Sequence, residues 1–380
     1  MTGGRIERVD AIPLRYPLPA PYGSARGVVS ARQATLVRVT TSDGVVGWGE
    51  AFGSPSVTAA CVNELAPYIV GGSLRAPGPL LAEVMQSGYH NGVTGPFTAA
   101  LSGIDIALWD ALGITLGVSV ARLLGGRARD RVAAYASTGF VTSSRGPDEF
   151  ASMLGDAVAC GFTAAKIKIG LGLPEDRLRA ETARKALGPA GTLLVDLNAN
   201  CTADGALRIM DGIADLDPAW VEEPVPPEDL EGYREFRRHI RVPVAAGEAV
   251  YTRHGFRPLI AERLVDVVQP DVAKCGGLSE AKVIVELARS WHLRVSPHVW
   301  GGAVAQAASL QLLATVPDYP HTRHPAEVLW LEFDQGPNPL RDAILHERIT
   351  AADGWVEIPD TPGLGIHVNE DAVNELRMDR

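Results

Sequence analysis

The chain has 380 residues, of which 46% are hydrophobic and 21% are charged. This length favours two domains over one, and the composition is that of an ordinary soluble globular protein. The net charge of −10 argues against nucleic acid and anionic membrane surfaces as partners. It does not exclude a small anionic substrate, because a metal ion and a few lysines can reverse the local charge.

Cysteine usage and hydropathy predict a cytoplasmic protein. The four cysteines lie far apart and form no CxxC pair, so we expect neither a disulfide framework nor a zinc site. No apolar stretch approaches the roughly 18 residues that a membrane span needs, and the first residues lack the apolar core of a signal peptide. We also expect the chain to form a homo-oligomer.

Residues 1–125 predict an α+β domain. The segments IERVDAIPL, ATLVRVT and VVGWGEA are typical of strands in a meander, with a turn at SDG (42–44). Helices are expected from residue 56 onward, and GPFTAALSGIDIALWDALG has the clearest helical spacing of apolar residues. A sheet followed by helices is the order of an α+β domain.

From residue 132 the pattern changes to alternating strands and helices. Seven of eight predicted strands precede a plausible helix, which favours a parallel TIM-type barrel over residues 126–344. An open doubly wound sheet is disfavoured, because no glycine-rich phosphate loop follows the first strand. Residues 345–380 return to short strands and turns and should pack back on the first domain. The predicted barrel strands are 132–137, 164–170, 193–199, 219–224, 242–248, 265–271, 293–299 and 328–333.

Three acidic residues end three consecutive predicted strands. Asp196, Glu222 and Glu248 follow one another at intervals of 26 residues, about the length of one strand, one helix and two loops. In a parallel barrel such strand ends meet at the C-terminal mouth, where barrel enzymes keep their active sites. Three converging carboxylates repel one another unless a cation joins them, and an all-oxygen ligand set favours Mg²⁺.

Other polar residues share the face that carries these acids. Because side chains alternate along a strand, Lys166 lies on the same face as Lys168, and Asp196 on the same face as Asn198. Glu223 has the opposite parity and is not expected to bind the metal. Two lysines on one face disfavour each other's protonation, which would make one of them a base near neutral pH.

The last three predicted strands also end in polar residues. Asp271 and His298 lie on adjacent strands, and an aspartate beside a histidine fixes its tautomer and supports its charged form. Glu332 ends the eighth strand, where crowding by other acids would keep it protonated and able to donate a hydrogen bond. With a metal ion, these groups suit abstraction of a proton next to a carboxylate, giving an enolate that the metal stabilises.

Each of these residues has a structural alternative. Strand-to-helix loops favour aspartate as a helix cap, and Asp271 fits that role best. A KxK pair or a single histidine is weak evidence by itself. Independent caps would not place a lysine, an acid or a histidine on each strand from the second to the eighth, so the coincidence favours a joint active site.

The ordered motifs resemble the enolase superfamily, mandelate racemase subgroup. ALSGIDIALWDALG is similar to a helix of its N-terminal capping domain, and KIKIG is similar to its KxK strand. VDLNAN, WVEEP and AAGEAV resemble its three metal-ligand strands, VVQPDVAKCGG and VSPHVWGG its Asp–His strands, and LEFD its final Glu strand. The resemblance implies a (β/α)7β TIM-type barrel under an α+β capping domain that the C-terminal segment completes.

The resemblance also implies a role for each site residue. Lys168 would be one acid/base group, and His298, paired with Asp271, would be the other on the opposite face of the substrate. Lys166 would assist Lys168 and contact the substrate carboxylate, with which Glu332 would form a hydrogen bond. The implied Mg²⁺ ligands are Asp196, Glu222 and Glu248.

Four longer segments resemble the D-galactarolactone cycloisomerases within this superfamily. They are CGFTAAKIKIGLG, SPHVWGGAVAQAASLQLLA, EFDQGPNPLRDAIL and IPDTPGLGIHVNEDAV. This resemblance implies β-elimination on a sugar-diacid lactone. Residues 16–30 and 51–56 are expected to form specificity loops. The expected substrate-binding residues are Asn198, Tyr22, Arg26 and Trp300.

Proton abstraction leaves three reactions open. Loss of a ring β-oxygen is cycloisomerisation, loss of β-hydroxide is dehydration of an acid sugar, and return of the proton to the other face is racemisation or epimerisation of a 2-hydroxy acid. A barrel that only binds a ligand is disfavoured, because such a protein should have lost a metal ligand or a base. We expect the substrate to be a small carboxylate sugar or its lactone.

Overall fold

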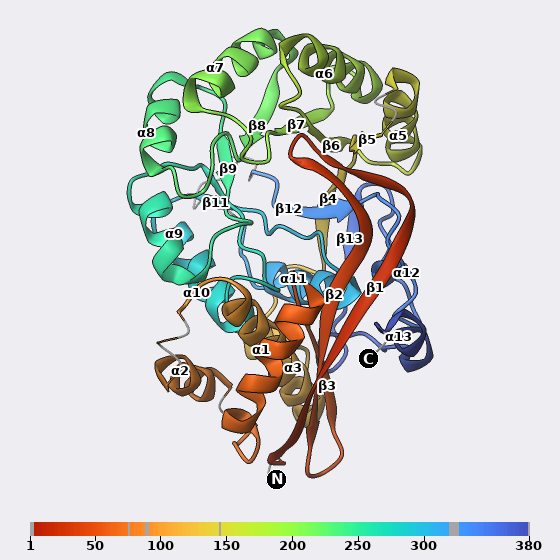
Figure 1. Ribbon diagram of the computed structural model, residues 1–380, viewed down its shortest axis with the longest axis vertical. Coiled ribbons are helices and arrows are strands. Elements are labelled where there is room, and N and C mark those ends of the chain that lie inside the picture. The colour runs from red at the N-terminus through yellow and green to blue at the C-terminus, as the bar shows by residue number, and fades with distance from the viewer. Residues whose placement is uncertain are drawn as a thin grey trace.

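The computed structural model describes residues 4–74, 77–87, 90, 92–143, 146–318 and 327–378 (Figure 1). Its N-terminal part contains a four-stranded antiparallel sheet in the order β3-β2-β1-β5. The strands are β1 (Ile6–Ser24), β2 (Gly27–Thr41), β3 (Val46–Ala51) and β5 (Val141–Thr142). Since β5 follows the first barrel strand in the chain, this sheet already joins the two parts of the molecule.

The hairpin of β1 and β2 is longer than the sequence predicts. We expected residues 16–30 to form a loop, but both strands continue through this segment. Their pairing runs to Pro17 and Ala31, shifts register, and resumes from Tyr22 and Val29 to the turn. The shift falls at PLPAP, where the proline nitrogens cannot donate to a strand ladder. The hairpin therefore extends as an arm toward the barrel (Figure 1).

Helices cover the N-terminal sheet. α3 packs directly on β3, where a Cβ atom at Gly49 would lie 1.8 Å from the carbonyl oxygen of Gly103, so only glycine permits the contact. α3 has the length and hydropathy of a membrane span, which the sequence prediction missed, but 78% of its most apolar window is buried inside the fold, as in a core helix. The helices are α1 (Pro55–Ile69), α2 (Pro77–Ser87), α3 (Pro96–Leu116) and α4 (Val120–Leu123).

The second part is a parallel barrel surrounded by helices, as predicted (Figure 1). Its strand order is β11-β10-β9-β8-β7-β6-β4-β12. The Ser296 hydroxyl donates to the Trp330 carbonyl at 3.1 Å and links the two end strands. The strands are β4 (Arg131–Ser137), β6 (Ala164–Lys168), β7 (Thr192–Asp196), β8 (Pro218–Glu222), β9 (Val244–Ala246), β10 (Val267–Val268), β11 (Arg294–Val295) and β12 (Trp330–Asp334). The helices are α5 (Pro147–Ala159), α6 (Leu173–Leu187), α7 (Ala203–Gly212), α8 (Leu230–His239), α9 (Thr252–Ala261), α10 (Gly277–Ser290) and α11 (Ala303–Ala314).

The C-terminal segment contacts both parts of the molecule. It contains α12 (Pro339–Asp342), β13 (Trp355–Glu357) and α13 (Glu370–Leu376). β13 pairs antiparallel with the barrel strand β4. Glu370 of α13 lies 3.2 Å from Arg38 of β2, and the Met378 amide donates to the Pro13 carbonyl at 2.9 Å. We expected the C-terminal segment to contact the first domain, and it does; its pairing with the barrel strand β4 was not expected. The domain boundaries at residues 125 and 344 stay predictions.

Two barrel helices begin at acids supplied by the N-terminal part. Glycine stands at the N-cap of both α10 and α11 and offers no side-chain acceptor. Asp105 of α3 accepts a hydrogen bond from the Ser279 amide of α10 at 2.9 Å. Glu50 of β3 accepts from the amides of Gly302 (2.5 Å) and Ala305 (3.0 Å) of α11. These carboxylates satisfy amides at the helix N-termini and hold the N-terminal part against the barrel.

Candidate active site

The barrel interior contains an apolar layer with a polar layer above it. The apolar layer consists of Tyr135, Ala164, Leu194, Trp220, Ala245 and Val267. Two residues further along their segments, four polar side chains face the same interior because side chains alternate along a strand. All four are at most 1% exposed, and they are Lys166, Asp196, Glu222 and Gln269. The strand parity predicted for these residues is therefore observed.

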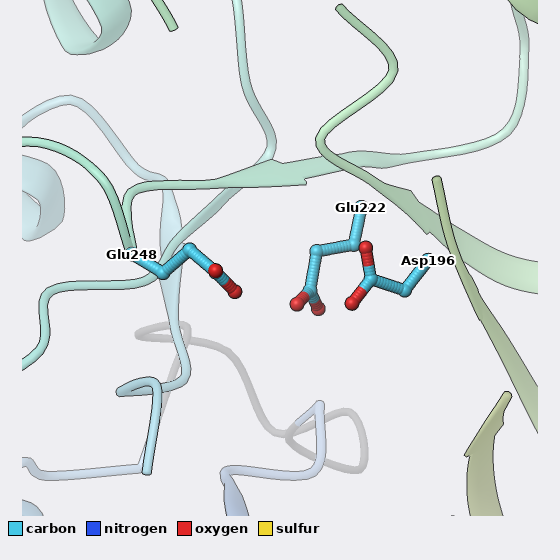
Figure 2. A group of neighbouring side chains, drawn as sticks. All are labelled: Asp196, Glu222 and Glu248. Atoms are coloured by element: carbon cyan, nitrogen blue, oxygen red, sulfur yellow. The ribbon is translucent and has the colours of Figure 1, made fainter. Parts of the chain in front are cut away.

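Asp196, Glu222 and Glu248 converge at the carboxyl ends of β7, β8 and β9, and their carboxylates point toward a common space (Figure 2). Each offers one oxygen, and these oxygens lie within 4.8 Å of one another. The Oε2 atom of Glu248 is buried without a described hydrogen bond. Burial raises the pKa of Glu222 to about 8, against the opposing charge of Lys166. The donor set therefore fits one hard divalent cation such as Mg²⁺.

Two buried lysines contact these acids. Lys166 Nζ lies 2.5 Å from Glu222 Oε1 and 2.9 Å from Glu332 Oε1. Lys168 Nζ lies 2.5 Å from Asp196 Oδ2. Burial lowers both lysine pKa values, but the carboxylates more than offset it, so the pKa of Lys168 is raised and that of Lys166 is raised well above its ordinary value.

The predicted depression of a lysine pKa by the lysine pair is therefore wrong for this structure. The charge of Asp196 acts on Lys168 more strongly than the charge of Lys166 does. A divalent cation on the same carboxylates would oppose them and lower both lysine pKa values.

Asp271 and His298 form the predicted pair. His298 Nδ1 lies 2.7 Å from Asp271 Oδ2, which leaves Nε2 on the side of Glu248, 3.4 Å from its Oε2. Burial lowers the pKa of His298, but Glu248 and Asp271 outweigh this effect and raise it to about 9. The other oxygen of Asp271 accepts from the Ala273 amide at 2.8 Å within the turn that precedes α10, whose N-cap is Gly276, so Asp271 is not the helix cap that was its structural alternative.

Glu332 is an anion rather than the protonated donor that the sequence suggested. Its Oε2 accepts from the Val299 amide at 2.9 Å, and its Oε1 faces Lys166. Burial raises its pKa, but Lys166, His298 and Lys168 outweigh burial and lower the pKa to about 2. We had considered only the neighbouring acids, whereas the nearest charged group is an ammonium.

A cavity of about 580 Å³ lies at the mouth of the barrel. Its wall includes residues of the hairpin tip, from Gly23 to Val29, and Phe52, which follows β3. Lys166, Asp196 and Glu222 are not part of its wall. The predicted site residues that line it are Arg26, Lys168, Asn198, Glu248, His298, Trp300 and Glu332.

Two family models match the chain. Residues 8–125 match the N-terminal domain of mandelate racemase / muconate lactonizing enzyme. Residues 149–372 match the model described as enolase C-terminal domain-like. The chain belongs to the mandelate racemase/muconate lactonizing enzyme family.

Named members of this family are similar over nearly the whole chain. D-galactarolactone cycloisomerase from Agrobacterium fabrum is 40% identical over 98% of this chain and 99% of its own. D-gluconate dehydratase from Thermoproteus tenax is 31% identical over 92% of this chain and 71% of its own. The crystal structure of 3,6-anhydro-D-galactonate cycloisomerase from Zobellia galactanivorans has a TM-score of 0.88 at 30% identity and covers 99% of this chain and 100% of its own. This chain is an enzyme of the enolase superfamily.

Three of the four predicted substrate-binding residues, Asn198, Arg26 and Trp300, line the cavity. Asn198 is 8% exposed, and its Oδ1 atom is buried without a described partner. Arg26, at the hairpin turn, donates to the Ala199 carbonyl at 3.1 Å. Trp300 lies under the Arg32 guanidinium, whose central carbon is 3.9 Å from its ring centroid.

Tyr22 is the exception among the predicted substrate-binding residues. It does not belong to the cavity wall, and its hydroxyl donates to the Pro337 carbonyl at 3.1 Å. Burial raises its pKa to about 12. Its ring packs against Phe140 with centroids 4.8 Å apart. Tyr22 therefore lies behind the cavity wall, because strand pairing continues through this part of the predicted loop, and its role in substrate binding stays a prediction.

Two further residues of the site were not predicted to belong to it. Arg32 is 3% exposed, lies 3.4 Å from Asp334, and donates to the Tyr22 hydroxyl at 3.3 Å. Glu223 lines the cavity although strand parity placed it on the opposite face. Its φ of 41° breaks the alternation directly after β8 ends. The adjacent acids in WVEEP were the only sequence signal for Glu223.

Proposed function

We propose that this enzyme is a Mg²⁺-dependent cycloisomerase of a sugar-diacid lactone, which removes the proton alpha to a carboxylate and then expels the ring β-oxygen. One observation carries the proposal: Lys168 and His298 line a single cavity and each lies against one of three converging carboxylates. The 40% identity to a D-galactarolactone cycloisomerase over nearly the full chain supports the substrate class.

Mg²⁺ held by Asp196, Glu222 and Glu248 would supply positive charge that stabilises negative charge developing on a substrate oxygen. Lys168 Nζ and His298 Nε2 are the proton-carrying atoms at the cavity. One of them takes the α-proton, and the other gives a proton to the departing oxygen as the carbon–oxygen bond breaks. Asp271 holds the His298 ring through Nδ1, so that Nε2 is directed to the substrate.

The cavity suits a compact, oxygen-rich acid. Its volume of about 580 Å³ is within the usual range for small-molecule sites. Lys168 and Arg26 can bind carboxylate oxygens, and the Asn198 amide oxygen, which has no partner among the described residues, can accept from a hydroxyl.

A second candidate function is dehydration of an acid sugar. The similarity to a D-gluconate dehydratase, 31% identical over 92% of this chain, favours it. The same two groups would act, but the leaving group would be a β-hydroxide instead of a ring oxygen. The substrate would then be an open-chain acid.

A substrate screen separates these functions. The purified protein with Mg²⁺ should be incubated with aldaric acid lactones, aldaric acids and aldonic acids, and keto-acid formation should be measured. Exchange of the substrate α-proton with solvent deuterium should accompany turnover. Turnover of lactones alone supports the cycloisomerase, and turnover of open-chain acids alone supports the dehydratase. If aryl 2-hydroxy acids react and every sugar acid and lactone fails, the proposal is wrong.

A further inference from the structure

Glu223 lines the cavity but has no role in the metal group or in the two acid/base groups. Its side chain is 4% exposed. Across the described residues, no hydrogen bond or ion pair is found for its carboxyl group, whereas Glu222, Glu332 and Asp271 all have such contacts. Because Glu223 lines the cavity, its carboxyl group is open to a partner that arrives with the ligand, and a ligand that covers it must supply that partner.

The backbone holds Glu223 in a conformation that turns it toward the cavity. Its φ of 41° lies in the left-handed region, which is strained for a non-glycine residue, and such strain is found most often at functional sites. Its amide donates to the Ala245 carbonyl at 3.0 Å, and its carbonyl accepts from the Ala199 amide at 2.8 Å. These bonds tie it to the segments after β7 and to β9, so the orientation is built into the barrel.

The charges around Glu223 restrict the ligand group that it can bind. A ligand carboxylate finds cationic partners in Lys168 and Arg26 on the cavity wall, whereas beside Glu223 it would add to the negative charge of Glu223 and Glu248. A ligand cation is disfavoured by Lys168, His298 and Arg26, which also line it. The remaining candidate for the ligand group that Glu223 binds is a neutral hydrogen-bond donor, and in a small oxygen-rich acid that donor is a hydroxyl group.

We propose that Glu223 accepts a hydrogen bond from one hydroxyl group of the substrate and thereby selects acids that are hydroxylated at that position. A site built to hydrogen-bond a hydroxyl strongly rejects the analogue that lacks it, because its own polar group is then left buried and unpaired. The inference rests on the proposed function only in taking the ligand to be a small acid bound in this cavity.

Ligand binding tests this inference without requiring turnover. Calorimetry in the presence of Mg²⁺ would compare galactarate, its 2-deoxy and 3-deoxy counterparts, and adipate, which has the same carbon chain and no hydroxyl. The proteins would be the wild type, Glu223→Gln, Glu223→Ala and the control Glu64→Gln, whose exposed carboxylate lies on α1 and outside the cavity wall. Mg²⁺ affinity and thermal unfolding would be measured for each.

The loss of affinity caused by the substitutions should depend on one hydroxyl group of the ligand. Galactarate should lose about tenfold or more in affinity with Glu223→Ala and less with Glu223→Gln, which keeps an acceptor. For the deoxy acid that lacks the bound hydroxyl, and for adipate, the same substitutions should change affinity by less than about twofold, as a double-mutant cycle requires. Glu64→Gln should bind every ligand like the wild type. If Glu223→Ala does not fold, Glu223→Gln carries the comparison.

Three results would overturn the inference. They are equal losses for all ligands, a wild type that binds galactarate no more tightly than adipate, and a tenfold loss of Mg²⁺ affinity in Glu223→Gln, which would make Glu223 a metal ligand. Failure of the proposed function is a different outcome. In that case the wild type turns over no sugar acid or lactone, yet Glu223-dependent preference for the hydroxylated acid remains.

Discussion

Lys166 lies within ion-pair distance of three carboxylates, those of Glu222, Glu332 and Asp196, and two of these acids titrate in opposite directions. The pKa of Glu332 falls to about 2, since three cationic side chains outweigh its burial. The pKa of Glu222 rises to about 8, since burial and neighbouring acids outweigh the single ammonium. At neutral pH Glu332 is therefore an acceptor already satisfied by the protein, whereas a bound cation would further stabilise the anionic form of Glu222.

Replacement of Glu248 tests the metal site. Glu248→Gln should weaken Mg²⁺ binding by at least about tenfold, because one anionic ligand is replaced by a neutral amide. Activity should fall in parallel at low Mg²⁺ concentration. Titration calorimetry measures the affinity, with Glu228→Gln as the control for loss of an exposed negative charge. An unchanged Mg²⁺ affinity would remove Glu248 from the ligand set.

Replacement of Lys168 or His298 tests the proton transfers. Lys168→Ala and His298→Asn should each reduce the turnover rate by about 10²- to 10⁴-fold, since each removes one acid/base group. Far-UV circular dichroism should show that the fold is kept. Lys282→Ala is a suitable control, because Lys282 contacts Glu286 within α10, away from the cavity. Near wild-type rates in both active-site variants would contradict the mechanism.

At the scale of elements, the β1–β2 hairpin forms part of the active-site wall. Arg32 connects the arm to the barrel: its guanidinium stacks on Trp300 and lies 3.4 Å from Asp334 beside the end of β12. β5 pairs with the same arm through Tyr22 and Gly23. Residues 16–30 therefore belong to a hairpin that several contacts hold against the barrel, and Arg32 supplies the buried charged contact among them.

Removal of this guanidinium should loosen the wall. Arg32→Ala should destabilise the protein by about 3–5 kcal/mol, because it leaves the buried carboxylate of Asp334 with a weaker set of partners. The KM of the substrate should rise more than kcat falls. Arg38→Ala, on the same strand but with partly exposed ion pairs to Asp10 and Glu370, should cost no more than about 1 kcal/mol. Urea unfolding compares the two, and equal losses would argue against the proposed role of Arg32.

At the scale of the molecule, the buried acids at the contact between the N-terminal part and the barrel, such as Asp105, make the free energy of unfolding depend on pH. Burial raises the pKa of Asp105 to about 7, although the Ser279 hydroxyl and amide oppose this. The unfolded carboxyl titrates near its ordinary value of about 4. The folded state therefore binds more protons between these two pH values, and stability is lost as pH rises through about 7.

Asp105→Asn should remove this contribution, since asparagine keeps an acceptor but does not ionise. The decrease in melting temperature between pH 5 and pH 8 should be smaller in the variant than in the wild type by about 2–4 °C. Differential scanning calorimetry measures both, with the exposed Asp204→Asn as the control. An identical pH dependence in all three proteins would show that Asp105 keeps the same charge over this range.

The sequence by itself determined the order of the barrel strands and the face on which the site residues within regular strands lie. Both depend on near neighbours: a strand alternates its side chains, and one strand plus one helix spans a nearly constant length. The placement of Lys166, Asp196 and Glu222 on one interior face followed from this local pattern alone.

Only the tertiary structure decided which groups contact each other across the barrel. The charge of Glu332 depends on Lys166, a residue far away in the chain, and Tyr22 is withdrawn from the cavity by Pro337 and Arg32. Glu223 faces the cavity because a left-handed backbone turn ends the strand alternation on which the parity argument relied. Long-range partners set these properties, and no spacing within the sequence specifies them.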